Sequence, residues 1–400
     1  MRDAAPRIDV IIAARNEEAL LASCLESLLS QDYPREKVRI TVVDNASTDG
    51  TAGIAAHYPV QLRREARPGA AAARNRALEE SDAELIAFLD AHCVLNSQWL
   101  VRMAAHFTDE AVGGCQARID NRASNPRLQR YLTRSGLLAN TRVLDDTVRG
   151  ELNIYPWILS GNSMYRRSAV QTVGGFDESL PACEDVDLAW RVVLLGYRLE
   201  YEDAAVAVHH NSDSWRGFLT KAKRYGEGSA VLARRYLAHG ARNAFKPASL
   251  WSTDIERTLS AFFYWVGYRA EAMRITFGAV DPSGPTVPER AMAPLRPPFH
   301  WSSTARLRIS DQVVYWFRGD AASVIVHRPT RSRVTLDGAG DFIWRRLADG
   351  CSRGETIARL VATYGISEVT AGADTDDLID ELLDAGILLA ADPQWLSAGL

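Results

Sequence analysis

The 400-residue chain is predicted to be an α/β protein with two domains. In its first half, short apolar runs alternate with segments of helical spacing, a pattern typical of parallel strands joined by helices. After a proline-rich stretch, short β-rich runs are followed by helical segments, which indicates a second, smaller α+β domain. A chain of this length is also long for one hydrophobic core and suggests two or three units.

The first half begins with two pairs of a strand and a helix. Val10–Ala14 is a continuous apolar run, and Glu17–Ser30 has leucines at helical spacing. Val38–Val43 is a second β-rich run that ends in a turn-forming segment beginning at Asp44, and Thr51–His57 resumes a helical pattern. Because ligands bind at the carboxyl ends of strands in such sheets, we expect the binding site beside Asp44 and its counterparts on neighbouring strands.

A third apolar run, Ile86–Leu89, ends in the sequence Asp90-Ala-His92. Side chains two residues apart in an extended segment point to the same side, so Asp90 and His92 could approach one divalent cation. That cation could hold a diphosphate group. We expect Mn²⁺ or Mg²⁺, and a neutral imidazole suits manganese better than magnesium. The alternative is a surface acid beside an uninvolved histidine.

Three ordered segments carry a resemblance to a known enzyme family. They are Val-Val-Asp44-Asn45-Ala-Ser-Thr-Asp49-Gly, the run through Asp90 and His92, and Glu184-Asp185-Val-Asp187-Leu-Ala-Trp190-Arg191. Together they resemble a family 2 glycosyltransferase of the GT-A fold, which is a Rossmann-like α/β domain. The resemblance implies a nucleotide-sugar donor, most simply a UDP-sugar. It implies that the donor is bound by Ala14, Arg15, Glu17, Asp44, Arg74, Asp90, Ala91, Gly161 and Asn162.

The chemistry of these residues suits the implied roles. A strand-end carboxylate such as Asp44 can accept a hydrogen bond from a base N–H, although it could instead be a turn-forming residue. Pro68–Asn75 opens a helix with glycine and alanines, so the backbone could approach the donor and Arg74 could reach its phosphates. Gly161-Asn162 is expected to touch the sugar or the acceptor, with ordinary turn formation as the alternative.

A third metal ligand is also expected. His209 and His210 follow the apolar run Ala204–Val208, and in the resemblance a histidine at about this place can complete the metal site. The sequence does not choose between the two histidines, and both could instead be structural.

An inverting sugar transfer needs a base beside the acceptor hydroxyl, opposite the leaving diphosphate. Asp185 is the candidate for this base, with Glu184 beside it, because the pair stands at the start of a helical pattern. The alternative is that these acids, or Asp187, cap the helix.

Charge limits the classes of partner. The 46 basic and 50 acidic residues give a net charge of −4, which argues against a general nucleic-acid binder. Residues 211–300 are locally basic, with 13 Lys or Arg against 7 Asp or Glu. Around Lys221 and Arg224 they resemble the amphipathic helix that in relatives lies over the donor or on a membrane surface. Peripheral membrane contact and a solvated helix face are both left open.

Targeting features point to the cytoplasm. The apolar stretch Leu259–Tyr268 is far shorter than the roughly 20 residues of a membrane-spanning helix. The N-terminus lacks the apolar core of a secretory signal. The five cysteines are scattered and odd in number, which argues against a disulfide framework. We expect a cytoplasmic protein without a transmembrane segment.

The last quarter of the chain carries a second resemblance. Residues 281–299 are rich in proline and are predicted to be a linker. Beyond them we predict strands at Gln312–Phe317, at Ser323–His327 and from Arg333, then helices near 342–347, 355–364 and 376–385. The sequences Leu336-Asp-Gly, Ile343-Trp, Asp349-Gly and Leu382–Leu388 resemble a PqqD-like domain, the winged-helix module that holds the leader segment of a precursor peptide. The alternative is a generic winged helix used for dimer contacts.

We therefore predict a GT-A glycosyltransferase domain at 1–240, a helical extension and linker at 241–303, and a PqqD-like domain at 304–392. The expected reaction is inverting, metal-dependent transfer of a sugar to a ribosomally synthesised precursor peptide. The alternatives are a transferase for cell-surface polysaccharide or lipid-linked acceptors, and a catalytically silent protein that escorts a peptide.

Overall fold

The computed structural model describes residues 5–135, 157–211, 214–236, 255–276, 279–284, 299–300, 306–310, 313–318, 322–327 and 332–390. The chain divides into two compact units: Met1–Val193 with Leu199–Pro288, and Glu289–Leu400 with Leu194–Arg198. The boundary between Pro288 and Glu289 lies inside the segment that was predicted to be a linker.

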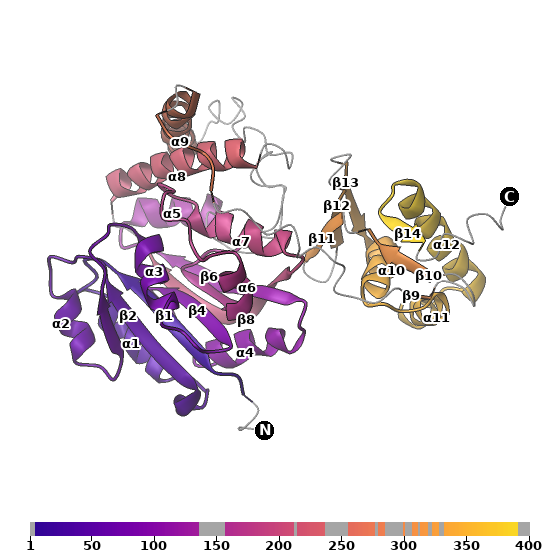
Figure 1. The fold of residues 1–400 in the computed structure, drawn as a ribbon, viewed down its shortest axis with the longest axis horizontal. Coiled ribbons are helices and arrows are strands. Elements are labelled where there is room, and N and C mark those ends of the chain that lie inside the picture. The colour runs from indigo at the N-terminus through magenta and orange to yellow at the C-terminus, as the bar shows by residue number, and fades with distance from the viewer. Residues whose placement is uncertain are drawn as a thin grey trace. The chain divides into compact units, whose positions relative to one another are not determined.

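The first unit is built on an eight-stranded sheet with the order β3-β2-β1-β4-β7-β6-β8-β5 (Figure 1). The strands are β1 (Ile8–Ala14), β2 (Val38–Asp44), β3 (Gln61–Arg64), β4 (Leu85–Asp90), β5 (Cys93–Leu95), β6 (Val112–Arg122), β7 (Asn162–Arg166) and β8 (Arg198–His210).

The sheet combines parallel and antiparallel pairs. β3, β2, β1 and β4 pair in parallel, whereas β7 runs antiparallel to β4 and β6, and β5 runs antiparallel to β8. The parallel sheet expected from the alternating pattern is therefore confirmed for β1 to β4 and wrong for the pairs that β7 forms with β4 and β6 and that β5 forms with β8. Alternation of strands and helices along the sequence predicts parallel pairing only where a helix connects two strands that are neighbours in the sheet.

The strand register brings the predicted ligand-binding ends together. In the parallel pairs, Ala14 lies opposite Asp44 and Ala13 lies opposite Asp90. The carboxyl ends of β1, β2 and β4 therefore meet at one edge of the sheet.

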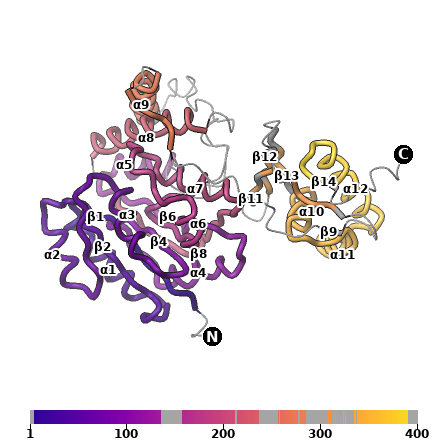
Figure 2. The backbone as a smooth tube through the Cα atoms, viewed as in Figure 1, coloured from indigo at the N-terminus to yellow at the C-terminus, as the bar shows by residue number. Residues whose placement is uncertain are grey.

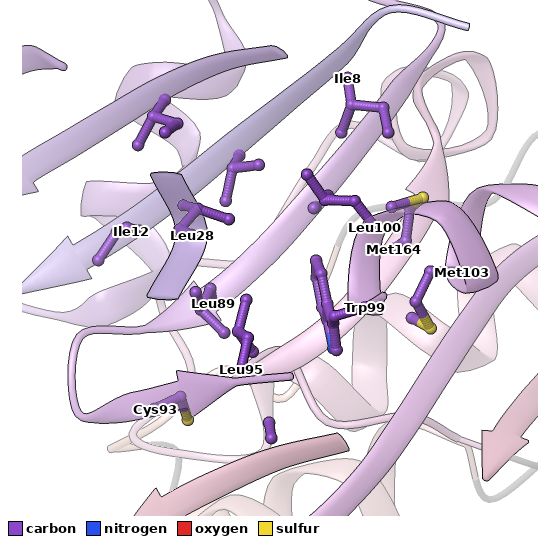
Figure 3. Close-up of a cluster of buried hydrophobic side chains, with 14 of the residues drawn as sticks. Ile8, Ile12, Leu28, Leu89, Cys93, Leu95, Trp99, Leu100, Met103 and Met164 are labelled. Atoms are coloured by element: carbon purple, nitrogen blue, oxygen red, sulfur yellow. The ribbon is translucent and has the colours of Figure 1, made fainter. Parts of the chain in front are cut away.

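Helices cover the sheet at α1 (Leu21–Leu29), α2 (Thr51–Ala56), α3 (Ala70–Leu78), α4 (Trp99–Ala105), α5 (Pro126–Ser135), α6 (Arg167–Thr172) and α7 (Glu184–Leu194). Short 3₁₀ turns lie at Arg35–Lys37 and His106–Thr108. The close-up in Figure 3 shows the main core, where Ile8 and Ile12 of β1, Leu28 of α1, Leu89 of β4 and Trp99 of α4 pack together. Each such side chain contributes about 1.5–3 kcal/mol on burial.

Two long helices, α8 (Trp215–Arg235) and α9 (Ile255–Thr276), complete the first unit and pack side by side (Figure 1). Glycines permit their close approach: a Cβ on Gly226 would lie 1.9 Å from the carbonyl oxygen of Tyr264, and one on Gly267 would lie 2.0 Å from that of Lys223. The helical extension that was predicted at 241–303 therefore belongs, as far as α9, to the first unit. Among the helices that the structure describes, none is both long enough and apolar enough to cross a lipid bilayer.

Within the residues that the structure describes, the second unit contains two small sheets and three helices. One sheet has the order β14-β10-β9 and the other β11-β12-β13. The strands are β9 (Phe299–His300), β10 (Arg306–Ile309), β11 (Val313–Arg318), β12 (Ala322–His327), β13 (Ser332–Asp337) and β14 (Leu388–Ala390). The helices are α10 (Gly338–Ala348), α11 (Arg353–Tyr364) and α12 (Glu368–Asp384), which Figure 2 shows gathered in this unit.

The core of the second unit is centred on Trp344, which is fully buried and stacks edge-on against Tyr315. Ser352 and Glu355 form a capping box at the start of α11, and Gly365 ends that helix with a φ of 67°. The third helix begins earlier than the prediction at 376, because the side chain of Ser367 caps it by accepting a hydrogen bond from the backbone N–H of Thr370.

Candidate active site

A cavity of about 650 Å³ opens at the carboxyl ends of the parallel strands. One part of its wall comes from the ends of β1 and β4 and from the start of α3. Another part comes from the segment 178–185, which leads into α7, and from α8. Segments that are far apart in the sequence thus line one cavity, at the edge of the sheet where the carboxyl ends of β1, β2 and β4 meet.

Three potential metal ligands converge on this cavity: Asp90, His92 and His209 each offer one atom, and these atoms lie within 4.8 Å of one another. The Nε2 atoms of His92 and His209 are 3.0 Å apart, and they lie 3.8 Å and 3.9 Å from Oδ2 of Asp90. Adjacent ligands on one ion are also about 3 Å apart when metal–nitrogen distances are near 2.1 Å. The donor set therefore fits a divalent cation.

Neighbouring groups act in opposite directions on the pKa values of the two imidazoles. Burial lowers the pKa of His92, but the hydrogen bond with Glu17 and the charge of Asp90 outweigh it and raise that pKa, whereas the pKa of His209 is lowered. Nδ1 of His92 is 2.9 Å from Oε1 of Glu17, so the proton on that ring is drawn to Nδ1 and Nε2 faces the metal group. Burial, His92 and Lys221 together lower the pKa of His209 to about 3, so this imidazole is neutral. A neutral imidazole is the form that binds a metal.

The two carboxylate oxygens of Asp90 have different neighbours. Arg74 donates from Nη2 to Oδ1 of Asp90 at 3.0 Å, while Oδ2 faces the two histidines. Burial opposes the charged carboxylate, but His92, Arg74 and His209 outweigh it and lower the pKa of Asp90 to about 2. Gly161 leaves room for this group, because a Cβ there would lie 2.3 Å from Oδ2 of Asp90.

Asp185 lies in the first turn of α7 and lines the same cavity. Burial, followed by the neighbouring charge of Glu184, raises the pKa of Asp185 to about 7. A carboxyl group with such a pKa is suited to take up a proton near neutral pH. Cys183, just before the helix, has a φ of 63°, a left-handed conformation that costs roughly 1–3 kcal/mol in a non-glycine residue.

The back of α7 is fixed by buried ion pairs. Asp187, which is fully buried, pairs with Arg191 and with Arg235 of α8, each at 2.7 Å. Tyr236 donates a further hydrogen bond to Asp187 at 2.8 Å. Helix α8 also touches the segment before Asp185, since a Cβ on Gly228 would lie 2.3 Å from the carbonyl oxygen of Ala182. The start of α7 therefore rests on a rigid support.

Most of the site residues suggested by the sequence line the cavity. They are Ala14, Arg15, Glu17, Arg74, Asp90, His92, Gly161, Glu184, Asp185 and His209. The structure also separates the two adjacent histidines, since His209 joins Asp90 and His92 whereas His210 does not. Neighbouring residues of a strand point to opposite faces, which explains the difference.

Three other predicted donor-binding residues do not line the cavity. The carboxamide of fully buried Asn162 accepts a hydrogen bond from Trp99 Nε1 at 2.7 Å and donates to the carbonyl of Ala117 at 2.9 Å, so its position supports the sheet and not a sugar contact. Asp44 is buried and accepts from the backbone N–H of Ser47 at 3.1 Å, which matches the turn-forming alternative. Ala91 is buried.

Arg74, the predicted phosphate ligand, has two acidic partners in the structure. It is 4% exposed, and its two terminal nitrogens donate to Asp90 and to Glu184, each at 3.0 Å. Lys221 of α8 supplies a different cation to the cavity. It has no ion-pair partner among the residues that the structure describes, its Nζ lies 5.8 Å from the Tyr225 ring centre, and its charge acts on Asp90, His209 and Asp185. From the sequence, Lys221 could be predicted only as part of a basic helix. Asp90 lies about 130 residues before it and Asp185 lies 36 residues before it, so no local pattern connects Lys221 with these acids.

Comparison with known proteins connects both units to protein families. Residues 9–174 match the family model for glycosyl transferase family 2, and residues 323–388 match the model for coenzyme PQQ synthesis protein D (PqqD). The chain joins a family 2 glycosyltransferase domain to a PqqD domain. Both resemblances read from the sequence are thereby confirmed.

The curated relatives that match the glycosyltransferase part include the following two. The pre-mycofactocin glycosyltransferase of Mycobacterium tuberculosis is 30% identical over 235 residues, which cover 57% of this chain and 48% of that protein. The beta-monoglucosyldiacylglycerol synthase of a Nostoc species is 29% identical over 231 residues, which cover 52% of this chain and 48% of that protein. The chain thus spans about half the length of these two relatives.

Among solved structures, the mannosyltransferase PcManGT from Pyrobaculum calidifontis, in complex with GDP-Man and Mn²⁺, is 25% identical to this chain. The similarity covers 68% of this chain and 79% of that one, with a TM-score of 0.47.

Proposed function

We propose that the protein transfers a sugar, with inversion, from a nucleoside-diphosphate donor to an acceptor peptide held by the PqqD domain. One observation carries the chemical half of this proposal. A carboxyl group whose pKa is about 7 shares a cavity with a three-ligand group that fits a divalent cation. Inverting transfer needs both a base for the acceptor and a means of stabilising the departing diphosphate.

In this reaction Asp185 takes the proton of the acceptor hydroxyl or thiol as that atom attacks the anomeric carbon. The bond between the anomeric carbon and the diphosphate oxygen breaks, and its electron pair leaves with the nucleoside diphosphate. A divalent cation bound by Asp90, His92 and His209 would neutralise charge on the leaving group. Lys221, which faces the same part of the cavity from α8, supplies a further positive charge for that diphosphate.

The peptide half of the proposal is supported by the second domain and by the named relative. An extended peptide can add a strand to the edge of a small sheet, and β11 and β13 are the edges of one such sheet. A tethered acceptor reaches an effective concentration of roughly millimolar at a nearby site. The relative named as a pre-mycofactocin glycosyltransferase supports an acceptor derived from a ribosomal peptide.

A lipid acceptor is the second candidate, because another relative is named as a glucosyldiacylglycerol synthase. The two acceptors make different demands on the chain. A peptide-directed enzyme needs its PqqD domain for acceptor turnover, whereas a lipid-directed enzyme does not.

The test is turnover of a panel of UDP- and GDP-sugars with Mn²⁺, in the presence of a candidate precursor peptide or of diacylglycerol vesicles, with the products identified by mass spectrometry. We expect a sugar-sized mass gain on the peptide that is lost in Asp185→Asn and when residues 300–400 are removed. Sugar transfer to lipid that survives the truncation would reject the peptide acceptor and keep the transferase. Absence of any donor turnover by the full chain would reject both.

A further inference from the structure

We propose that Arg74 is a positioning residue that orients the metal-binding carboxylate and the base-bearing segment together, and that it is not a phosphate ligand. The inference deepens the proposed function and rests on it. Asp90 would supply the metal ligand and Asp185 the base, and a single guanidinium lies between the segments that carry them.

Arg74 uses two of its five N–H groups for carboxylates, and its Nε, which has no partner among the described residues, is buried from solvent, so little of the guanidinium is accessible to a ligand. Its Nη2 donates to Oδ1 of Asp90 and its Nη1 donates to Oε1 of Glu184, each at 3.0 Å. The guanidinium also stacks over the ring of Phe176 at 5.4 Å. A side chain that is 4% exposed and pairs with a carboxylate through each terminal nitrogen is an internal brace. Lys221, by contrast, lines the cavity and has no ion pair with a carboxylate among the described residues.

On the metal side, Arg74 determines which oxygen of Asp90 is available. Because Oδ1 is taken by the guanidinium, Oδ2 alone faces the Nε2 atoms of His92 and His209. Gly161 gives that oxygen the space it occupies, since any Cβ there would meet it at 2.3 Å. Asp90 therefore offers one oxygen, Oδ2, to a metal ion, and the hydrogen bond from Arg74 fixes the orientation of that oxygen.

On the base side, Arg74 holds the residue directly before Asp185. Its bond to Glu184 ties the first turn of α7 to α3 and, through Asp90, to the end of β4. The positive charge also offsets the effect of Glu184 on its neighbour. Two carboxylates from different segments require the two-pronged, planar geometry of arginine, which a lysine ammonium does not reproduce.

The sequence of α3 explains how this arginine comes to be buried. Ala71, Ala72, Ala73 and Ala77 are all buried, so the helix lies close against the sheet and carries Arg74 inward. Arg76, on the same helix, faces outward and pairs with Glu80 at 2.7 Å on the surface. The two arginines are two residues apart and differ in burial, which makes Arg76 a matched control.

The experiment compares Arg74→Lys with Arg76→Lys in the full chain, using two separate binding measurements. Mn²⁺ affinity is measured by electron paramagnetic resonance titration without nucleotide, and UDP affinity is measured by calorimetry in the presence of EDTA. We expect Arg74→Lys to weaken Mn²⁺ binding by about 10- to 100-fold, the usual cost of losing a group that orients a metal ligand. Metal-free UDP binding should stay within twofold of wild type, and Arg76→Lys should change neither.

Two results would overturn the inference. Unchanged Mn²⁺ affinity in folded Arg74→Lys would show that the arginine does not orient Asp90, and a loss of metal-free UDP binding would show that it contacts phosphate. A wild-type chain that bound neither Mn²⁺ nor UDP would instead count against the proposed function itself.

Glu184→Gln gives a second measurement that leaves Arg74 in place. We expect Mn²⁺ affinity within about threefold of wild type and kcat lowered at least tenfold with little change in donor KM, because the base-bearing turn loses its brace. Wild-type kcat in this variant would overturn the base-side half of the inference.

Discussion

Two acids on one turn of α7 show how differently the chain treats its buried charge. Asp187 is fully buried and receives hydrogen bonds from Arg191, Arg235 and Tyr236, so its negative charge is balanced within the protein. Asp185, two residues earlier, lines the cavity, and burial together with Glu184 raises its pKa to about 7. An acid whose charge is fully paired stabilises the fold, whereas an acid with few partners remains able to exchange a proton with a substrate.

The largest expected effect is on catalysis at Asp185. Asp185→Asn should lower kcat by roughly 10²- to 10⁴-fold, because the acceptor loses its base. Its effect on stability should have the opposite sign. A carboxyl whose pKa is raised in the folded state destabilises the fold as pH rises from about 4 towards that pKa, so the variant should melt at a higher temperature than wild type at pH 8 and at nearly the same temperature at pH 4.

Activity assays and thermal melts at the two pH values check this prediction. Asp203→Asn, which removes an exposed acid of β8, serves as the control and should change neither measurement. An Asp185→Asn variant that kept wild-type kcat would remove Asp185 from the catalytic role.

Asp187→Asn should give the complementary result. Removing one charge of a buried ion-pair cluster costs about 3–5 kcal/mol, since Arg191 and Arg235 lose their balancing carboxylate. Urea denaturation would measure this loss. A change below about 1 kcal/mol would contradict the contrast drawn between the two acids.

A smaller effect is expected at Glu17, which hydrogen-bonds to Nδ1 of His92. Glu17→Gln should weaken Mn²⁺ binding by about tenfold or somewhat more, because the ring loses the partner that fixes its tautomer. The chain offers a matched control in Glu202→Gln, which alters a similar pair with His106, at 2.9 Å, away from the cavity. Equal Mn²⁺ affinities for the two variants would argue against the role of Glu17.

The smallest predicted effect concerns pH. Because the base acts in its deprotonated form, kcat/KM should fall about tenfold per pH unit below an apparent pKa near 7. In Asp185→Asn, the residual activity should no longer show this fall in kcat/KM at low pH. A fall that stayed in Asp185→Asn would assign the titration to another group.

Local patterns were enough to predict the strand ends at Asp44 and Asp90 and the helix beginning near Asp185, because the ends of strands and helices depend mainly on residues that are adjacent in the sequence. They also led to His209 and His210 as candidates, but only the alternation of β8 distinguishes one from the other. The roles of Arg74 and Asn162 could not be derived in this way. Each depends on partners in distant segments, such as Glu184 and Trp99, that the sequence alone does not place beside them.

The second unit shows the same limit. Strands β11 to β13 were predicted from alternation, whereas β10 and β14, which pair across some 80 residues, are short strands whose pairing no local pattern reveals. Tertiary pairing is what makes such short segments strands.

The 3.0 Å approach of His92 and His209 has a consequence for metal uptake itself. At that distance the two ring nitrogens share one hydrogen-bonding proton, and the same lone pairs are those that a cation would use. Although burial opposes it, the hydrogen bond with Glu17 and the charge of Asp90 raise the pKa of His92, and the protonated ring has no free lone pair for a cation. Proton and cation are thus competitors, so Mn²⁺ that binds to protonated His92 releases a proton into the medium. The apparent heat of binding should change with the ionisation enthalpy of the buffer, and the affinity should decline as the solution becomes more acidic.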